Sequence, residues 1–213
     1  YPKGSYVLEA GCGIGAQTRI LTRRSPGAQF LSVDISDESL EKAKALTKGA
    51  NISNVSFRQS NLNSLPDADN TFDHVFVCFV LEHLENPTTV LNELMRVLKP
   101  GGSFTVIEGD HGSCFWQPET PESEKAWNSL IVAQQDLGHD PLIGRRLCPL
   151  LSDFNLKLEY VEPRFVYGDN LKPKLLDDMV NKIIVPMVKA SKGKVLEEKI
   201  ISIEDWDKGT ADL

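Results

Sequence analysis

The segment Val7-Leu-Glu-Ala-Gly-Cys-Gly-Ile-Gly15 places three glycines directly after a short apolar run. The helical pattern of residues 17–24 follows, so the glycines fall between a predicted strand and a predicted helix. Glycine adopts left-handed backbone conformations without steric cost, and its missing side chain lets another molecule touch the backbone. A strand, a glycine loop and a helix in this order therefore favour an α/β fold that begins at the first residues of the chain.

Apolar runs and helical patterns continue to alternate through the first half of the chain. Asn86-Pro87 opens a predicted helix, since proline is favoured at the first helical position, and Pro100-Gly-Gly102 ends it. An earlier helix begins at Ser36 or Asp37, either of which can cap it. Further strands are predicted at residues 30–34, 55–58, 74–78 and 103–107. This order needs crossover connections, so we expect a doubly wound, mostly parallel sheet with helices on both faces.

The alternation stops after Glu108. A helix is predicted to open at Thr120-Pro121, with Trp127 on its apolar face, and to end at Gly138. The later predicted elements are a short helix around Leu147, Leu150 and Leu151, a sixth strand from Leu156 to about Tyr167, a long helix from Pro173 that is kinked at Pro186, and the start of a helix at Ile203. We interpret residues 1–213 as one domain, with residues 1–108 as its core and residues 109–148 and 169–213 as helical lid insertions.

Composition narrows the classes of partner. The 213 residues carry a formal net charge of −7, which opposes nucleic acid or an anionic membrane as the default partner. No apolar run approaches the ~18 residues of a membrane span. The four cysteines are widely spaced and form no C-x-x-C pair, which predicts reduced thiols in a cytoplasmic protein and no metal site. The sequence leaves the oligomeric state open.

The glycine spacing by itself is ambiguous. Gly11-x-Gly13-x-x-Ala16 also satisfies the dinucleotide fingerprint, and Asp34 lies at the expected distance of ~20 residues. In both interpretations a carboxylate on the second strand accepts the ribose hydroxyls, while the glycines let the ligand pack on bare backbone. The segment therefore indicates an adenosine-containing ligand and leaves a nicotinamide cofactor open.

Four further features separate the two interpretations. Glu9 lies two residues before the first glycine, where a dinucleotide would place its negative pyrophosphate, so a carboxylate there suits a cationic ligand better. Ser60-Asn61-Leu62 follows the third strand, where an amide can pair with an adenine edge. The other two features are Phe72-Asp-His-Val75 leading into Cys78-Phe-Val-Leu-Glu-His83, and Arg96-Val-Leu-Lys-Pro-Gly-Gly102 before the fifth strand. In this order the set resembles the class I (Rossmann-like) S-adenosylmethionine-dependent methyltransferases of the methyltransferase domain 11 type, over residues 5–108.

The resemblance implies S-adenosylmethionine as the cofactor and assigns its contacts position by position. Asp34 matches the acid that binds the ribose, and Ile35 matches the residue that packs on the adenine. Asn61 takes the position that faces the adenine amine, where the family usually has Asp. The expected cofactor-binding residues are Glu9, Gly11, Cys12, Gly13, Gly15, Gln17, Thr18, Asp34, Ile35, Asn61, Leu62, Cys78 and Phe79, with Gln17 and Thr18 near the cofactor's carboxylate.

The chain departs from the family pattern at the end of its sheet. The family sheet carries a seventh, antiparallel strand inserted beside the sixth. The sixth candidate is the segment from Leu156 to Tyr167, and no clear seventh follows before Leu213. We therefore expect the segment from Asp169 onward to be an insertion.

The resemblance also implies in-line transfer of a methyl group to a small-molecule acceptor. Alignment of nucleophile, methyl and sulfur can be worth ~7–11 kcal/mol in well-oriented systems. A general base is needed only where the acceptor loses a proton, and the candidates are Glu82, His83, Asp110 and His111. His83 has a structural alternative, in which it caps the loop before Asn86.

Other functions stay open at this point. A nicotinamide-dependent oxidoreductase is the main alternative from another enzyme class, and a module that binds the cofactor without catalysis is another. Within the methyltransferases, an RNA- or protein-modifying enzyme remains an alternative to one that acts on a small molecule.

Overall fold

The computed structural model describes all of residues 1–213, which divide into two compact units. Residues Tyr1–Gly109 form the first, here called the sheet unit, and Asp110–Leu213 form the second, here called the helical unit. The division falls one residue beyond the predicted end of the core, at the point where the sequence ceases to alternate strands and helices.

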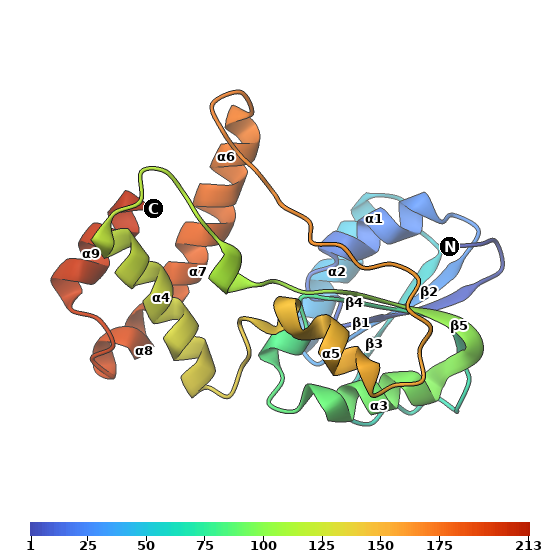
Figure 1. Ribbon diagram of the computed structural model, residues 1–213. Coiled ribbons are helices and arrows are strands. Elements are labelled where there is room, and N and C mark those ends of the chain that lie inside the picture. Colours follow the sequence, from blue (N-terminus) through green and yellow to red (C-terminus); the bar gives the residue numbers. More distant parts are fainter. The chain divides into compact units, whose positions relative to one another are not determined.

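The sheet unit is built on five parallel strands in the order β3-β2-β1-β4-β5 (Figure 1). The strands are β1 (Tyr6–Ala10), β2 (Gln29–Asp34), β3 (Val55–Gln59), β4 (Phe72–Cys78) and β5 (Leu98–Ile107). The strand order reverses between β1 and β4, because β2 pairs on one side of β1 and β4 on the other. The predicted parallel sheet is confirmed, and its reversal point is where α/β sheets of this kind bind ligands.

Helices cover both faces of this sheet, as expected. Figure 1 shows α1 (Ala16–Arg24) and α2 (Asp37–Gly49) on one face and α3 (Pro87–Val97) on the other. The Ser36 hydroxyl caps α2 by accepting the Ser39 N–H at 3.2 Å. Asn86 caps α3 in the same way, with Pro87 at the first helical position. Both predicted helix starts are therefore confirmed.

The core of the sheet unit lies on the central strands. In β1, Val7, Leu8 and Ala10 are fully buried, which is typical of a strand covered on both faces. Phe30 of β2 and Phe72 of β4 are among the largest buried side chains. Burial of a side chain of this size stabilises the fold by about 1.5–3 kcal/mol, so these strands contribute strongly to the stability of the sheet unit.

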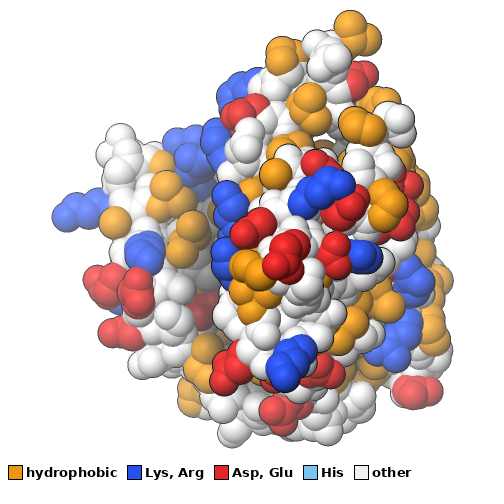
Figure 2. All heavy atoms as spheres, turned by 90° about the vertical axis from the view of Figure 1, so that its left-hand side faces the viewer, with side chains coloured by type: hydrophobic (Ala, Val, Ile, Leu, Met, Phe, Trp, Pro, Cys, Tyr) orange, Lys and Arg blue, Asp and Glu red, His pale blue; other side chains and the backbone are white.

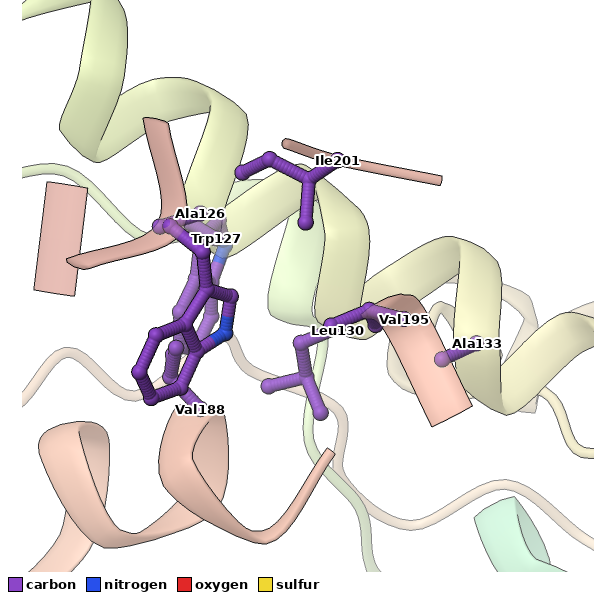
Figure 3. Close-up of a cluster of buried hydrophobic side chains, with 8 residues drawn as sticks. Ala126, Trp127, Leu130, Ala133, Val188, Val195 and Ile201 are labelled. Atoms are coloured by element: carbon purple, nitrogen blue, oxygen red, sulfur yellow. The ribbon is translucent and has the colours of Figure 1, made fainter. Parts of the chain in front are cut away.

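The helical unit packs around α4 (Pro121–Asp136), which opens at Thr120 and Pro121 as predicted. Trp127 of α4 is 4% exposed and lies in a cluster with Leu130, Val188 and other apolar residues (Figure 3). Its indole N–H donates to the His111 carbonyl at 2.9 Å. The other helices of the unit are α5 (Leu147–Ser152), α6 (Pro173–Met179), α7 (Val185–Ala190), α8 (Lys192–Glu197) and α9 (Ile203–Asp212).

The predicted sixth strand is wrong. Residues 155–167 have no regular structure, and all of them are exposed. The alternation of apolar and charged residues that starts at Leu156 is typical of a half-buried strand. A strand also needs a neighbouring backbone and a face to bury, and here no strand pairs with the segment.

The long helix predicted from Pro173 is interrupted where the proline requires it. Residues Val180–Ile184 form a π-helical turn between α6 and α7, and Pro186 lies in the first turn of α7. Proline has no N–H to donate and its ring clashes with the preceding turn, so the wider turn accommodates it. The predicted irregularity at Pro186 is confirmed.

Charged side chains of both signs are interspersed with apolar ones on the face drawn in Figure 2. Several of the charges pair within the helical unit, as Lys208 does with Glu122 and Lys125 with Asp205. No helix has the length and hydrophobicity of a transmembrane span.

Candidate functional site

The glycine loop joins β1 to α1 in a conformation that only glycine adopts readily. Gly11, Gly13 and Gly15 have φ values of +77°, +51° and +83°. The N–H groups of Gly11 and Cys12 both donate to the Val33 carbonyl at 2.9 Å, which fixes the loop against the end of β2. An L side chain in the left-handed region costs roughly 1–2 kcal/mol, so the three glycines are needed for this backbone path.

The three glycines differ in what lies beside them. A Cβ on Gly11 would meet the Val80 side chain at 2.4 Å, and one on Gly15 would meet Ala43 at 2.9 Å. A Cβ on Gly13 would have nothing within 4 Å. Gly11 and Gly15 are therefore required by packing inside the protein, whereas the backbone at Gly13 is open to an approaching ligand.

Asp34, the last residue of β2, ties this open backbone to the second strand. One carboxylate oxygen accepts the Gly13 N–H at 2.8 Å and the other accepts the Ser36 N–H at 2.9 Å. A carboxylate has about four lone-pair sites, so each oxygen can still accept a hydroxyl of a ligand. The side chain of Ile35 is 68% exposed, so a flat apolar group can cover it.

Glu9 lies inside the unit below the loop, with 2% of its surface exposed. Its Oε2 accepts the hydroxyl of Thr18 at 2.6 Å and that of Ser32 at 2.5 Å. Burial raises the pKa of Glu9, and the two hydroxyl groups oppose that shift. The arrangement keeps a carboxyl group under the glycine loop at the position where the sequence predicts it.

This arrangement corrects the expectation for Thr18. Thr18 is fully buried and its hydroxyl is used by Glu9, so it supports Glu9 and does not reach a ligand. Gln17, one residue earlier, is only half-buried. Burial raises the pKa of the Cys12 thiol to about 12, which keeps this loop residue neutral.

The segment after β4 borders the same edge of the sheet. Burial raises the pKa of Cys78 to about 11, so its thiol is a packing group rather than a thiolate. Phe79 has a left-handed backbone, with φ +55°, and its side chain is 52% exposed. Its N–H donates to the Ile107 carbonyl at 2.9 Å, which joins the ends of β4 and β5. An exposed aromatic side chain on a strained backbone is typical of a functional segment.

A short 3-10 turn, Leu81–His83, carries two of the predicted base candidates. Glu82 is buried, and its Oε1 lies 3.6 Å from Nε2 of His83. Burial lowers the pKa of His83, so its ring is neutral at pH 7. A neutral imidazole can accept a proton, which an imidazolium cannot.

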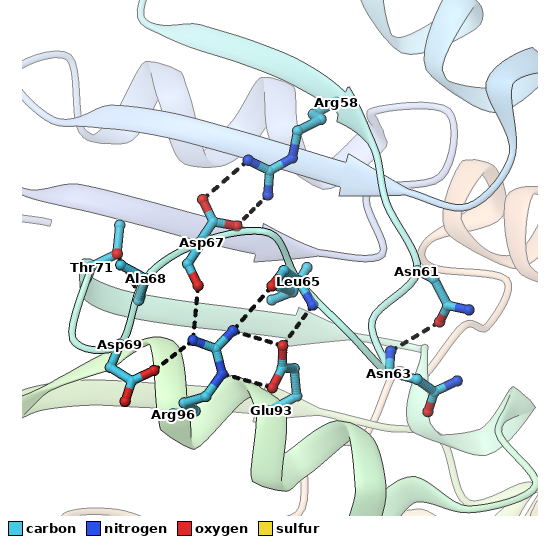
Figure 4. A network of polar contacts seen from close by, with 10 residues as sticks. All are labelled: Arg58, Asn61, Asn63, Leu65, Asp67, Ala68, Asp69, Thr71, Glu93 and Arg96. Atoms are coloured by element: carbon cyan, nitrogen blue, oxygen red, sulfur yellow. Dashed lines mark hydrogen bonds and ion pairs between the residues drawn. The ribbon is translucent and has the colours of Figure 1, made fainter.

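The loop that carries Asn61 is held by a polar network (Figure 4). Arg96 of α3 donates to the carbonyls of Leu65 and Asp67 at 3.1 and 2.8 Å, and it pairs with Glu93. Glu93 in turn accepts the Leu65 N–H at 2.6 Å. Asn61 itself is exposed, and its side-chain oxygen accepts the Asn63 N–H at 2.9 Å. The other side-chain contacts of the network pair Arg58 with Asp67 and Arg96 with Asp69.

The remaining base candidates belong to the helical unit. Burial alone would raise the pKa of Asp110, but hydrogen bonds from Arg145 and Ser113 lower it below its usual value. An ion-paired carboxylate of this kind is a weak base. His111 places Nδ1 3.0 Å from the side-chain oxygen of Gln134, and its ring packs on Trp127.

Three contributors received no site role from the sequence. Ser32 was missed because a serine in a strand is common, and Arg96 was noted only as part of the motif before the fifth strand, not as a support of the Asn61 loop. The third is Glu108, directly after β5, whose Oε1 accepts the N–H groups of Val80 and Leu81 at 3.0 and 2.8 Å. Burial raises the pKa of Glu108 to about 7, and the backbone N–H groups of Val80, Leu81 and Glu82 oppose the shift. An acidic residue directly after a predicted strand was the available signal.

Comparison with known proteins bears on the family of the chain. Residues 8–106 match a family described as methyltransferase domain. An uncharacterised methyltransferase of Schizosaccharomyces pombe is 36% identical over 154 residues, which are 68% of this chain and 54% of that protein. A demethylmenaquinone methyltransferase of Lactobacillus johnsonii is 25% identical over 194 residues, which are 90% of this chain and 74% of that protein.

Comparison with a solved structure bears on the fold. The solved structure of a putative sarcosine dimethylglycine methyltransferase from Galdieria sulphuraria aligns with a TM-score of 0.62 at 16% identity, covering 98% of this chain and 70% of that one. The present chain thus spans about half the length of the first relative and about three quarters of the second. These matches confirm the expected family and fold and give no support to the nicotinamide alternative.

Proposed function

The chain belongs to the class I S-adenosylmethionine-dependent methyltransferases, and from this premise we propose that it transfers a methyl group to a small organic acceptor. The observation that carries the proposal is the backbone of Gly13, which is open to a ligand directly beside the Asp34 carboxylate. Nothing in the protein fills the space that a side chain at residue 13 would occupy. Glycine with positive φ at this point therefore fits a cofactor that lies against the loop.

The residues present fit the cofactor in chemistry as well as in space. Asp34 keeps lone pairs for the two ribose hydroxyls, and exposed Ile35 offers an apolar surface to the adenine. Asn61 would pair with the adenine edge. Glu9 places a carboxyl group under the loop, which suits a cationic ligand. Burial raises the pKa of this carboxyl group, and the hydrogen bonds from two hydroxyl groups counteract the rise.

The bound cofactor would supply a methyl group on a positively charged sulfur. The contribution of the protein is alignment, which can lower a barrier by ~7–11 kcal/mol when the reacting atoms are well oriented. Where the acceptor must lose a proton, the neutral ring of His83 can take it. Glu82, next to it and buried, would favour the resulting imidazolium by its negative charge. Asp110, paired with Arg145, is a poorer candidate.

The acceptor that we propose to test first is a demethylated naphthoquinol. The support comes from the relative named demethylmenaquinone methyltransferase, which aligns with 90% of this chain. In such a reaction the bond from sulfur to methyl breaks, a carbon–carbon bond forms, and the ring carbon loses a proton. We propose that the neutral ring of His83 accepts this proton as the general base. The substrate-covering role of residues 109–148 and 169–213 remains a prediction.

The test compares two glycines that share a backbone conformation. Gly13→Ala and Gly4→Ala both place a side chain at a positive φ where nothing lies within 4 Å, but Gly4 is outside the proposed site. Each variant should lose roughly 1–2 kcal/mol of unfolding free energy because of backbone strain. Only Gly13→Ala should weaken binding of S-adenosylhomocysteine, by about tenfold or more, as expected for a loss of at least 1.4 kcal/mol.

The same two variants then enter a transfer assay with labelled S-adenosylmethionine and the naphthoquinol. Transfer by the wild type and by Gly4→Ala, with loss in Gly13→Ala, supports the proposal. Equal cofactor binding by both variants would contradict the assigned site. Cofactor binding by the wild type without transfer to the naphthoquinol, but with transfer to other metabolites, would reject only the acceptor.

A further inference from the structure

Glu108 reaches across from the end of β5 to the segment that follows β4. Its Oε1 accepts two consecutive N–H groups, those of Val80 at 3.0 Å and Leu81 at 2.8 Å. These N–H groups begin the 3-10 turn Leu81–His83, which has no side-chain cap of its own. An N-cap residue accepts the free N–H groups at the start of a helix. Glu108, which follows β5, accepts the first N–H groups of this turn in the same way, although it is distant from the turn in sequence.

The turn that Glu108 holds connects two parts of the site. Val80 packs against Gly11 so closely that a Cβ on Gly11 would lie 2.4 Å from a Val80 methyl group. On the other side of the same turn, Glu82 and His83 are the base candidates. A shift of the turn would therefore move the wall of the glycine loop and the base candidates together.

We propose that Glu108 is a positioning residue for methyl transfer: its carboxyl group clasps the Val80–Leu81 backbone, which sets Val80 against the glycine loop and fixes the place of Glu82 and His83. The inference rests on the proposed function of the same site. Glu108 contacts the turn through backbone N–H groups and makes no side-chain hydrogen bond to the glycine loop, so its effect on the loop and on the side chains of Glu82 and His83 passes through the turn.

Two observations set Glu108 apart from an ordinary cap. Its Oε2 is buried and has no hydrogen-bond partner, so only Oε1 of the carboxyl group binds the turn. Burial raises its pKa to about 7, and the negative charge of Glu82 adds to the shift. The titratable groups that interact with it are Glu82 on the turn and Cys78 on β4, whose own pKa Glu108 raises further. The clasp is therefore a carboxylate at pH 8 and largely a carboxylic acid at pH 6.

Because burial disfavours the charged form of Glu108 where it holds the turn, the clasp should weaken as the pH rises from 6 to 8. The two variants that separate this role from packing are Glu108→Gln and Glu108→Leu. Glutamine keeps a side-chain oxygen for the two N–H groups but does not titrate. Leucine removes the acceptor while filling a similar volume. Glu41→Leu, on the exposed surface of α2, is the matched control for loss of a carboxylate.

The first measurement is the dissociation constant of S-adenosylhomocysteine, by calorimetry at pH 6 and pH 8. Glu108→Leu should weaken binding by about tenfold at pH 6, the loss expected when two backbone donors lose their acceptor. Glu108→Gln should match the wild type at pH 6 within about threefold and should lack the weakening of the wild type at pH 8. Glu41→Leu should bind as the wild type does at both pH values.

The second measurement is hydrogen exchange at the amides of Val80 and Leu81, which a general loss of stability would not single out. Protection of these two amides should fall in Glu108→Leu and persist in Glu108→Gln, relative to amides of β1. A double-mutant cycle with Val80→Ala should show coupling, because both changes act on the same contact with the glycine loop. If Glu108→Leu fails to fold, two experiments still test the positioning role. They are the comparison of Glu108→Gln with the wild type at pH 6 and pH 8, and the double-mutant cycle of Glu108→Gln with Val80→Ala.

The outcomes separate this inference from the function on which it rests. Wild type that binds no S-adenosylhomocysteine would overturn the proposed function. Wild type that binds it, together with unchanged affinity and pH dependence in both Glu108 variants, would overturn the positioning role alone. Weakened binding in Glu108→Leu with rescue in Glu108→Gln supports it.

Discussion

Phe30 and Phe165 show how the two units of the molecule differ. Phe30 lies in β2 between two paired strands and is 1% exposed, whereas Phe165 lies in a segment without regular structure and is 73% exposed. Both residues stand in stretches whose sequence predicts a strand. The difference teaches that an apolar pattern gives a segment the capacity to form a strand, while a neighbouring backbone and a face to bury decide whether it does.

The units also differ in how their buried polar groups are used. In the sheet unit the buried carboxylate of Glu9 accepts two hydroxyl groups, and the unpartnered Oε2 of Glu108 lies at the proposed site. In the helical unit the unpartnered buried atoms are Nε1 of Trp206 and Oγ1 of Thr210, both on α9. The unpartnered oxygen of Glu108 thus lies at the proposed site, whereas the two unpartnered atoms of the helical unit lie on the helix that packs on α4.

The largest expected effect is in the core of the helical unit. Trp127→Ala removes the central side chain of the cluster in Figure 3 and should lower the unfolding free energy by roughly 3–5 kcal/mol. Val132→Ala, on an exposed part of α4, is the control and should change it by less than about 0.5 kcal/mol. Chemical denaturation followed by circular dichroism measures both.

The same variant tests whether the two units act separately. The S-adenosylhomocysteine affinity of Trp127→Ala should stay near that of the wild type, because the cofactor site is built from residues of the sheet unit. A large loss of affinity would show that the helical unit contributes to cofactor binding and would weaken the comparison.

The second effect concerns the network in Figure 4. Arg96→Met removes the side-chain donor to the carbonyls of Leu65 and Asp67 and the ion-pair partner of Glu93, and should cost about 1–3 kcal/mol. Lys42→Met breaks only an exposed pair with Glu38 and should cost less than about 1 kcal/mol. Thermal unfolding compares the two. Equal small losses in both variants would show that the network does not hold the Asn61 loop.

The third effect depends on pH. The pKa of Glu108 is raised from 4.5 to about 7 in the folded protein, so between these values the folded state binds more protons than the unfolded state. The unfolding free energy that this carboxyl contributes is therefore fully present below pH 4.5 and is lost as the pH rises through 7. Glu108→Gln removes the loss and should be more stable than the wild type at pH 8, by about 1–3 kcal/mol after allowance for partial exposure.

Urea denaturation at pH 5 and pH 8 measures this difference. Near pH 5 the two proteins should differ little. A gain of stability in Glu108→Gln that is as large at pH 5 as at pH 8 would contradict the raised pKa of Glu108.

The smallest effect is expected outside both cores. Phe165→Ser changes a side chain that packs on little, so it should alter the unfolding free energy by less than about 0.5 kcal/mol. Thermal unfolding should be measured for Phe165→Ser and for Phe30→Ala, which should cost roughly 3–5 kcal/mol. The two losses compare the exposed Phe165 with the buried Phe30 directly. A loss above 2 kcal/mol in Phe165→Ser, on the scale of a core residue, would mean that the segment is packed after all.

The fold of the sheet unit could be predicted because its signals are local. Ser36 and Asn86 cap helices with their own side chains, and the apolar run of β4 marks a strand buried on both faces. The segment from Leu156 to Tyr167 carries an equally regular pattern, yet forms no strand. Strand pairing joins residues far apart in the chain, and a pattern within one segment contains no information about its partner.

The site follows the same division. The glycine loop and Asp34 are recognisable because each chemical role requires a particular residue type at a fixed distance along the chain. Thr18 was misassigned because helical spacing did not show that it points inward to Glu9. Glu108 was missed because its role depends on Val80 and Leu81, which are 28 and 27 residues away in sequence.

The most direct test of the central claim is a calorimetric titration of the wild-type protein with S-adenosylhomocysteine and, separately, with NAD. The open backbone at Gly13 beside Asp34 predicts saturable binding of S-adenosylhomocysteine at one site per chain and no saturable binding of NAD. Saturable binding of NAD, with none of S-adenosylhomocysteine, would contradict the account.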